Sequence, residues 1–194
     1  MDNLYEQIEY RGFNINVHYD TEPFNPREES EPAGHMVCFH GRYDLGDKHD
    51  LTQEGLKDIV DNPDNVSLPL YLYDHSGVTM SCGPFSCPWD SGQVGYIYMT
   101  KEEIAKESWT EEQAIKYMQG EVEMYDQFLT GQVYGYTIEP TERNKSIECE
   151  DSCWGFFGET DYMVTEAEGA INYAIKEYKQ EVIKTHKRGG KNER

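Results

Sequence analysis

The chain has 194 residues, of which 37% are hydrophobic and 13% aromatic, and its formal net charge is -20 at pH 7. This length and apolar content suffice for a hydrophobic core, so they exclude a disordered chain or one that needs disulfides or a metal to fold. No apolar run approaches the roughly 18 residues of a membrane-spanning helix, and the acidic N-terminus lacks the basic and then apolar pattern of a signal peptide. We therefore expect a soluble cytoplasmic protein with no membrane partner.

The charge is unevenly distributed along the chain. Residues 1–170 carry 10 Lys and Arg against 34 Asp and Glu, a net charge of -24, whereas residues 171–194 carry 7 against 3, a net charge of +4. A strongly acidic body repels nucleic acid and anionic membranes and attracts basic protein surfaces. We therefore expect a partner protein with a basic surface and no direct nucleic acid binding by the body. The alternative is that the charge serves only solubility.

The first part of the chain predicts two strands, a loop and a helix. Residues 13–19 alternate apolar and polar side chains, as a half-buried strand does. Three prolines and a cluster of glutamates at 20–35 predict an exposed acidic loop, and residues 36–40 predict a short strand. Thr52 stands where an N-cap is expected for a helix that runs to about residue 62.

The middle of the chain is dense in strand patterns. Two short strands flank a tight turn at 75–77, and a further strand follows at 94–99. Thr100-x-x-Glu103 and Thr110-x-x-Gln113 then have the pattern of capping boxes, which open a short helix and a longer one. Gly131 ends the longer helix.

The last third predicts a hairpin and a final helix. Residues 133–138 and 147–154 form the hairpin, and Thr165-x-x-Glu168 caps the helix. Adjacent strand pairs with inserted helices predict the α+β class, with a largely antiparallel sheet and helices packed on one face. We expect a single domain over residues 1–186 and a basic flexible tail at 187–194.

Two turns in the centre of the sequence form the most conspicuous candidate site. The turns, at 74–77 and 84–92, hang from the same few strands, and loops on a rigid sheet often carry function. Trp89 offers a stacking face beside the carboxylate of Asp90, and prolines and glycines stiffen the loop. The residues expected to form a binding surface are Trp89, Asp90, Gln93, His75 and Ser76. Alternatively, the polar side chains of these turns only satisfy backbone amides.

An enzyme is the other interpretation of the same residues. In a small hydrolase or transferase, Cys87 would be the nucleophile, His75 its base, and Asp74 or Asp90 the orienting carboxylate. A metal-dependent enzyme would use His40, His49 and His75 together with Asp44 and Asp47. Because their spacing matches no standard metal site, we predict neither a metal nor a cofactor.

The chain contains five cysteines, at positions 38, 82, 87, 149 and 153. An odd number with no export signal predicts reduced thiols. The pairs Cys82 with Cys87 and Cys149 with Cys153 have spacings near those of zinc ligands, but buried free thiols are the preferred interpretation.

Residues 68–98 read LPLYLYDHSGVTMSCGPFSCPWDSGQVGYIY. This motif resembles an uncharacterised protein family found in bacteriophages, prokaryotic mobile elements and some bacterial and archaeal genomes. HGRYDLGDKH at 40–49, GQVYGYTI at 131–138 and DSCWGFFG at 151–158 match the same family, so the resemblance covers most of residues 36–160. It implies an association with mobile elements and no established activity.

These observations favour an acidic protein-binding protein of phage or mobile-element type. It could inhibit a host nucleic-acid-acting or defence enzyme by mimicking the charge of DNA, which carries one charge per about 1.7 Å of duplex. Helical acidic residues could supply part of such a row, although an ordinary solvated helix face is the alternative. The residues of this acidic face are Glu102, Glu103, Glu107, Glu111, Glu112, Glu121, Glu123 and Asp126.

Overall fold

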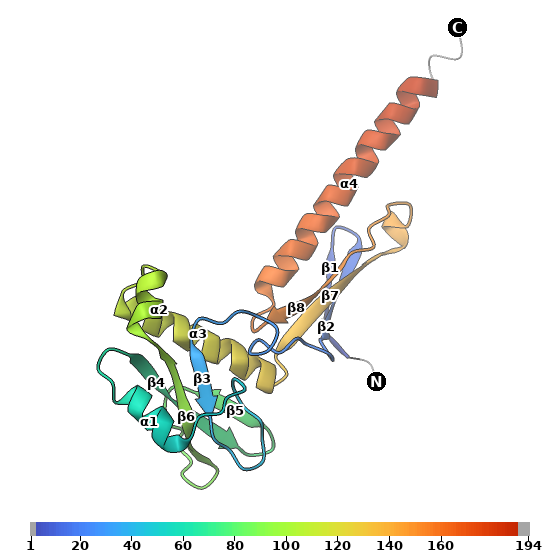
Figure 1. Ribbon diagram of the computed structural model, residues 1–194. Helices are drawn as coiled ribbons and strands as arrows, with labels where there is room; N and C mark the ends of the chain where they lie inside the picture. Colours follow the sequence, from blue (N-terminus) through green and yellow to red (C-terminus); the bar gives the residue numbers. More distant parts are fainter. Residues whose placement is uncertain (1–2, 190–194) are drawn as a thin grey trace. The chain divides into compact units, whose positions relative to one another are not determined.

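The structure of the protein is a computed structural model that describes residues 3–189, with side chains described up to residue 185 (Figure 1). The chain separates into two compact units. Unit 1 contains the residues up to Pro23 and those from Val133 onward, and unit 2 contains Phe24–Gln132. Unit 2 is therefore inserted into the sequence of unit 1. The single domain predicted for residues 1–186 stays a prediction, because compactness alone does not decide whether two units fold as one.

Unit 1 is an antiparallel four-stranded sheet in the order β1-β2-β7-β8, with one long helix. Its elements are β1 (Leu4–Tyr10), β2 (Phe13–Tyr19), β7 (Val133–Pro140), the short 3-10 helix η1 (Glu142–Asn144), β8 (Ser152–Phe157) and α4 (Asp161–Gly189). The strand predicted at 13–19 is confirmed. Its apolar residues Phe13, Ile15 and Val17 are fully buried in a core shared with α4, which extends beyond the strands of this unit (Figure 1).

The start of α4 was predicted wrongly. The helix begins at Asp161, and the Thr165 hydroxyl donates to the Asp161 carbonyl one turn earlier, at 2.9 Å. Thr165 therefore lies inside the first turns and is no N-cap, because a threonine side chain within a helix can bond back to the preceding turn. The helix continues to Gly189, so residues 187–189 of the predicted tail are helical. Residues 190–194 lie outside the described residues.

Unit 2 is a second antiparallel four-stranded sheet, in the order β3-β6-β4-β5, with three helices. Its elements are β3 (His35–Cys38), α1 (Gln53–Val60), β4 (Val66–Asp74), β5 (Val78–Ser81), β6 (Ser91–Met99), α2 (Lys101–Lys106) and α3 (Glu111–Leu129). The core forms where Leu70, Ile97 and Met99 of the sheet pack against Met118 and Tyr125 of α3. The central motif thus forms three of the four strands of this sheet.

The structure confirms the α+β class with antiparallel pairing, but the strands form two sheets where one was expected. The cause is that β2 pairs with β7 over seven residue pairs, from Phe13 with Pro140 to Tyr19 with Tyr134, so the intervening strands pair among themselves. The N-cap at Thr52 and both capping boxes are confirmed. No helix in the described part of the chain is both long enough and apolar enough to cross a membrane.

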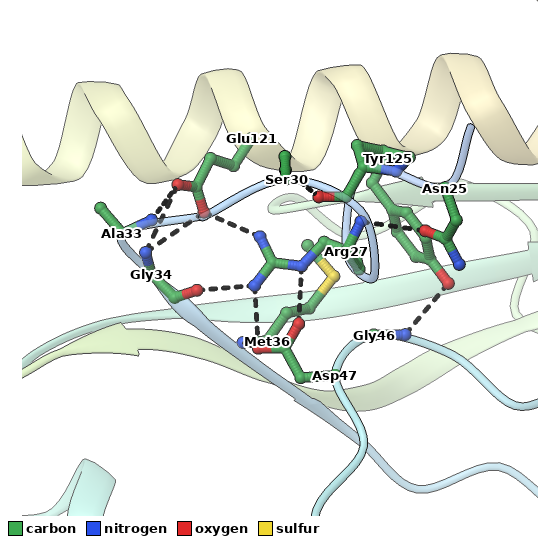
Figure 2. A network of polar contacts seen from close by, with 11 residues as sticks. Asn25, Arg27, Ser30, Ala33, Gly34, Met36, Gly46, Asp47, Glu121 and Tyr125 are labelled. Carbon is green, nitrogen blue, oxygen red and sulfur yellow. Dashed lines mark hydrogen bonds and ion pairs between the residues drawn. The ribbon is translucent and has the colours of Figure 1, made fainter. Parts of the chain in front are cut away.

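A buried arginine fixes the loop that precedes β3. The Arg27 side chain is 1% exposed, and its guanidinium donates to both carboxylate oxygens of Asp47 at 2.8 Å and to Glu121 of α3 at 2.9 Å (Figure 2). It also donates to the Gly34 carbonyl at 2.6 Å. The glutamates at 28, 29 and 31 are exposed, as predicted for this loop, but the loop is tied to the sheet and to α3 through Arg27.

Candidate functional site

Three segments that are distant in the sequence meet at one end of the unit 2 sheet. Arg42 and Tyr43, from the loop after β3, both bind the carboxylate of Asp74, the last residue of β4. The Tyr43 hydroxyl donates to Asp74 Oδ1 at 3.2 Å, and Arg42 forms an ion pair with Oδ2. The Asp74 amide in turn donates to the Asp90 carbonyl at 2.8 Å, which ties the strand to the loop before β6. The two central turns and the 40–49 loop therefore form one surface.

A groove of about 390 Å³ lies between these segments. Its lining comprises Phe39, His40, Gly41, Arg42, Leu72, Asp74, Trp89, Asp90, Ser91, Gly92, Gln93 and Val94. Its lining combines apolar side chains with polar and charged ones, which is the usual composition of a recognition site. We call this surface the tryptophan groove.

Trp89 is the most exposed large apolar side chain among the described residues. Its side chain is 90% exposed, although tryptophan is normally largely buried. The loop that carries it is braced, because the Ser91 hydroxyl donates to the Cys87 carbonyl and the Asp90 carbonyl accepts from Asp74. The indole is thus presented to solvent by a backbone that is held on both sides.

Two of the residues considered for thiol catalysis, His75 and Cys87, lie beside the same carboxylate oxygen of Asp90. Its Oδ2 lies 3.3 Å from His75 Nδ1 and 3.7 Å from Cys87 Sγ. The thiol and the imidazole are therefore no more than about 7 Å apart. The carboxylate stands between them, whereas a nucleophile needs its base within hydrogen-bond reach, roughly 3 Å. Asp74 does not join this cluster, because Arg42 and Tyr43 bind both of its oxygens.

Most of the residues considered for a metal have other contacts, whereas Asp44 is exposed. Asp47 binds Arg27, and His49 Nε2 pairs with the Cys38 carbonyl at 3.1 Å. His40 stacks on Tyr43, and its Nδ1 accepts two backbone amides at 3.3 Å. Within residues 3–189 the described side chains contain no group of three or more His, Cys, Asp or Glu that could hold a metal ion.

The predicted acidic face divides into exposed and internally bonded carboxylates. Glu121 binds Arg27 and the Ala33 amide, and Asp126 accepts from the Met80 amide at 2.7 Å. Burial raises the pKa of Asp126 despite that hydrogen bond. Glu103 closes the capping box of α2 and lies 2.7 Å from His35 Nε2. The remaining members are exposed, namely Glu102, Glu107, Glu111, Glu112 and Glu123.

All five cysteines are free thiols in the structure. Cys38 and Cys149 are buried, and burial raises the pKa of both, that of Cys38 to about 12. Deprotonation is what makes a thiol reactive, so these two positions are suited to packing.

The binding of Asp74 by Arg42 and Tyr43 was not predicted from the sequence, where this loop was considered only for His40, Asp44, Asp47 and His49 as metal ligands. No local pattern could have found it, because these contacts join residues that are 32 and 31 positions apart. No protein-family model matches this chain, and neither a curated protein nor a solved structure resembles it significantly.

Proposed function

We propose that this protein binds a partner protein with a basic surface through the tryptophan groove. The observation that carries the proposal is the 90% exposure of Trp89 on a braced loop. Tryptophan is enriched among the residues that dominate binding energies at protein interfaces. A loop that is already held in place loses little conformational entropy on binding, so its contacts contribute more fully to affinity.

The charge of unit 2 supports a basic partner. Residues 24–132 carry 7 Lys and Arg against 20 Asp and Glu, a net charge of -13. Complementary charge accelerates encounter and favours correct partners over wrong ones. At the groove itself, Arg42 is already paired with Asp74, whereas the described contacts of the Asp90 carboxylate are with a thiol and an imidazole.

A finer form of the proposal is that the partner is a host nucleic-acid-acting or defence enzyme, inhibited by charge mimicry of DNA. The resemblance to mobile-element proteins and the net charge of -24 over residues 1–170 support this form. Only the five exposed members of the acidic face can contribute. Mimicry predicts that affinity falls steeply with salt, as it does when phosphates are neutralised.

A second candidate function is thiol chemistry at Cys87, which the convergence of Cys87, His75 and Asp90 favours. An activated thiol reacts faster than an ordinary exposed one. The alkylation rate of Cys87 with iodoacetamide at pH 7 should therefore exceed that of exposed Cys153 if Cys87 is a nucleophile. If Cys87 is alkylated no faster than Cys153, the thiol function is rejected and binding remains the proposed function.

The test of the proposed function is comparative affinity capture from a natural host lysate with quantitative mass spectrometry. The baits are the wild-type chain, Trp89→Ala and Tyr173→Ala, because Tyr173 is also well exposed (65%) but lies on α4. We expect one or a few proteins with basic surfaces to be captured by the wild type and by Tyr173→Ala, and at least tenfold less by Trp89→Ala. Undiminished capture by Trp89→Ala would contradict the proposal.

A further inference from the structure

Two pairs of a carboxylate and an aromatic ring lie at this end of the sheet, and one of them, Asp74 of the tryptophan groove with Tyr43 outside its lining, already holds a guanidinium. Arg42 forms an ion pair with Asp74, and its guanidinium carbon lies 5.5 Å from the centre of the Tyr43 ring. Tyr43 also donates to the same carboxylate. The protein therefore shows, with one of its own arginines, how a carboxylate and a ring together hold a guanidinium.

The second pair is Trp89 with Asp90, and among the described contacts no lysine or arginine binds it. Asp90 uses Oδ2 for both His75 and Cys87, which leaves Oδ1 without a hydrogen-bond partner in the described contacts. Gln93 donates its amide to the Gly95 carbonyl at 3.4 Å, so its amide oxygen is also free of described partners. Trp89, Asp90 and Gln93, the residues that carry an exposed indole and these two oxygens, line the same groove.

From this geometry we infer that Trp89, Asp90 and Gln93 form a receptor for an arginine side chain of the partner. The inference rests on the proposed function and specifies what the groove recognises. A guanidinium stacks its flat face on an aromatic ring while it donates several hydrogen bonds in its own plane. The free groups here are acceptors, which match the donor-only guanidinium and disfavour an anion.

Arginine fits this receptor better than lysine. An ammonium group is a compact and strongly hydrated point charge, so it gains less from a broad indole face. Arginine is also the basic residue that is enriched at protein interfaces, where lysine is depleted. We therefore expect the groove to bind a surface rich in arginine more tightly than one rich in lysine.

The test uses the full chain and three synthetic peptides that differ only at three positions occupied by arginine, lysine or citrulline. Citrulline keeps the planar shape of arginine but lacks its charge. By isothermal titration calorimetry at pH 7.5, we expect the arginine peptide to bind at least threefold more tightly than the lysine peptide and tenfold more tightly than the citrulline peptide. Trp89→Ala and Asp90→Asn should each weaken arginine-peptide binding about tenfold, while Asp58→Asn, the same change at an exposed carboxylate on α1 outside the acidic face, should not.

Equal affinity for arginine and citrulline peptides, or equal losses in Asp90→Asn and Asp58→Asn, would overturn the inference. If the arginine peptide fails to bind while Trp89→Ala still abolishes capture of a lysate partner, the receptor is wrong and the proposed function stands. If Trp89→Ala changes neither peptide binding nor capture of the lysate partner, the receptor and the proposed function are both wrong.

Discussion

Arg27 illustrates how much one side chain can organise in this protein. It joins the loop before β3 to Asp47 and to α3, and its guanidinium is almost completely removed from solvent (Figure 2). Burial alone would lower the pKa of Arg27, but the hydrogen bonds and charges of Asp47 and Glu121 outweigh it and raise the pKa. The arginine is therefore charged, and its removal leaves two carboxylates without their partner.

We expect Arg27→Ala to destabilise the protein by about 3–5 kcal/mol, because loss of one partner leaves buried charge uncompensated. The measurement is the free energy of unfolding from urea titration. Lys48→Ala is the control, since Lys48 forms an ion pair with Glu28 while its side chain is 89% exposed, and it should change stability by no more than about 0.5 kcal/mol. Similar effects for both variants would mean that the Arg27 network does not hold the loop.

Glu103 gives a prediction about pH. Burial would raise its pKa, but hydrogen bonds from His35 and from Thr100 outweigh burial and hold the pKa below its ordinary value of 4.5. A carboxyl whose pKa is lowered on folding stabilises the folded state above the unfolded pKa, and that contribution is lost as the pH falls through the folded pKa. Glutamine can still close a capping box, so Glu103→Gln isolates the effect of the charge.

Glu103→Gln should therefore be less stable than the wild type by a few tenths of a kcal/mol at pH 7, as expected for a partly exposed pair. The difference should be present at pH 7 and pH 5 and should shrink toward pH 3, because the contribution of the carboxylate is lost as the pH falls through its lowered pKa. Urea midpoints at these three pH values measure it, and Glu102→Gln serves as the control. A difference that grows toward pH 3 would contradict the assignment.

At the scale of the elements, the sheet of unit 2 depends on a glycine. A Cβ on Gly95 of β6 would lie 1.9 Å from the Val37 carbonyl oxygen of β3, whereas one on Gly92 of the same strand would meet nothing within 4 Å. Gly95→Ala must therefore displace backbone in a neighbouring strand, and we expect it to cost more than about 2 kcal/mol. Gly92→Ala should stay within about 0.5 kcal/mol. Thermal melts of both variants test the prediction, and equal melting temperatures would contradict it.

Local sequence patterns predicted several elements well because interactions between residues close together in the sequence determine these elements. The capping boxes at Thr100 and Thr110 are reciprocal side-chain bonds within four residues, and the alternation at 13–19 reports a half-buried strand. By contrast, β1 was not predicted, since most of its side chains are exposed and its pattern carries little hydrophobic signal. The hairpin strand expected at 147–154 begins only at Ser152, because Ile147 and Cys149 are buried from a loop.

The two-sheet arrangement could not be predicted from such patterns. Which strands pair is decided by contacts between distant residues, as between Tyr19 and Tyr134. In the candidate site, too, residues within one sequence segment could be predicted, whereas contacts between distant segments could not. The sequence indicated Trp89, Asp90 and His75 because they share one motif, whereas the ion pair of Arg42 with Asp74 joins two separate loops. The ion pair of Glu121 could not be predicted either, because its partner Arg27 is 94 residues away.

At the scale of the whole molecule, unit 2 is an insertion between two strands that pair directly. The Asp20 amide donates to the Val133 carbonyl at 2.8 Å, so the ends of the insertion lie side by side in unit 1. Replacing residues 21–132 with Asn-Gly, the preferred two-residue hairpin turn, should therefore leave unit 1 folded. We expect a cooperative thermal transition and a far-ultraviolet circular dichroism spectrum with helix and sheet. A spectrum without a cooperative transition would show that unit 1 needs unit 2 to fold.

The central claim is that the partner contacts the tryptophan groove, and site-specific photocrosslinking in host cells tests it most directly. A photoreactive phenylalanine analogue replaces Trp89 in one chain and Tyr173 in the other, since both side chains are well exposed and lie on different units. We predict a discrete adduct from position 89 only, with the crosslink mapped beside arginine residues of a basic partner surface. The same adducts from both positions, or an adduct only from position 173, would contradict the account.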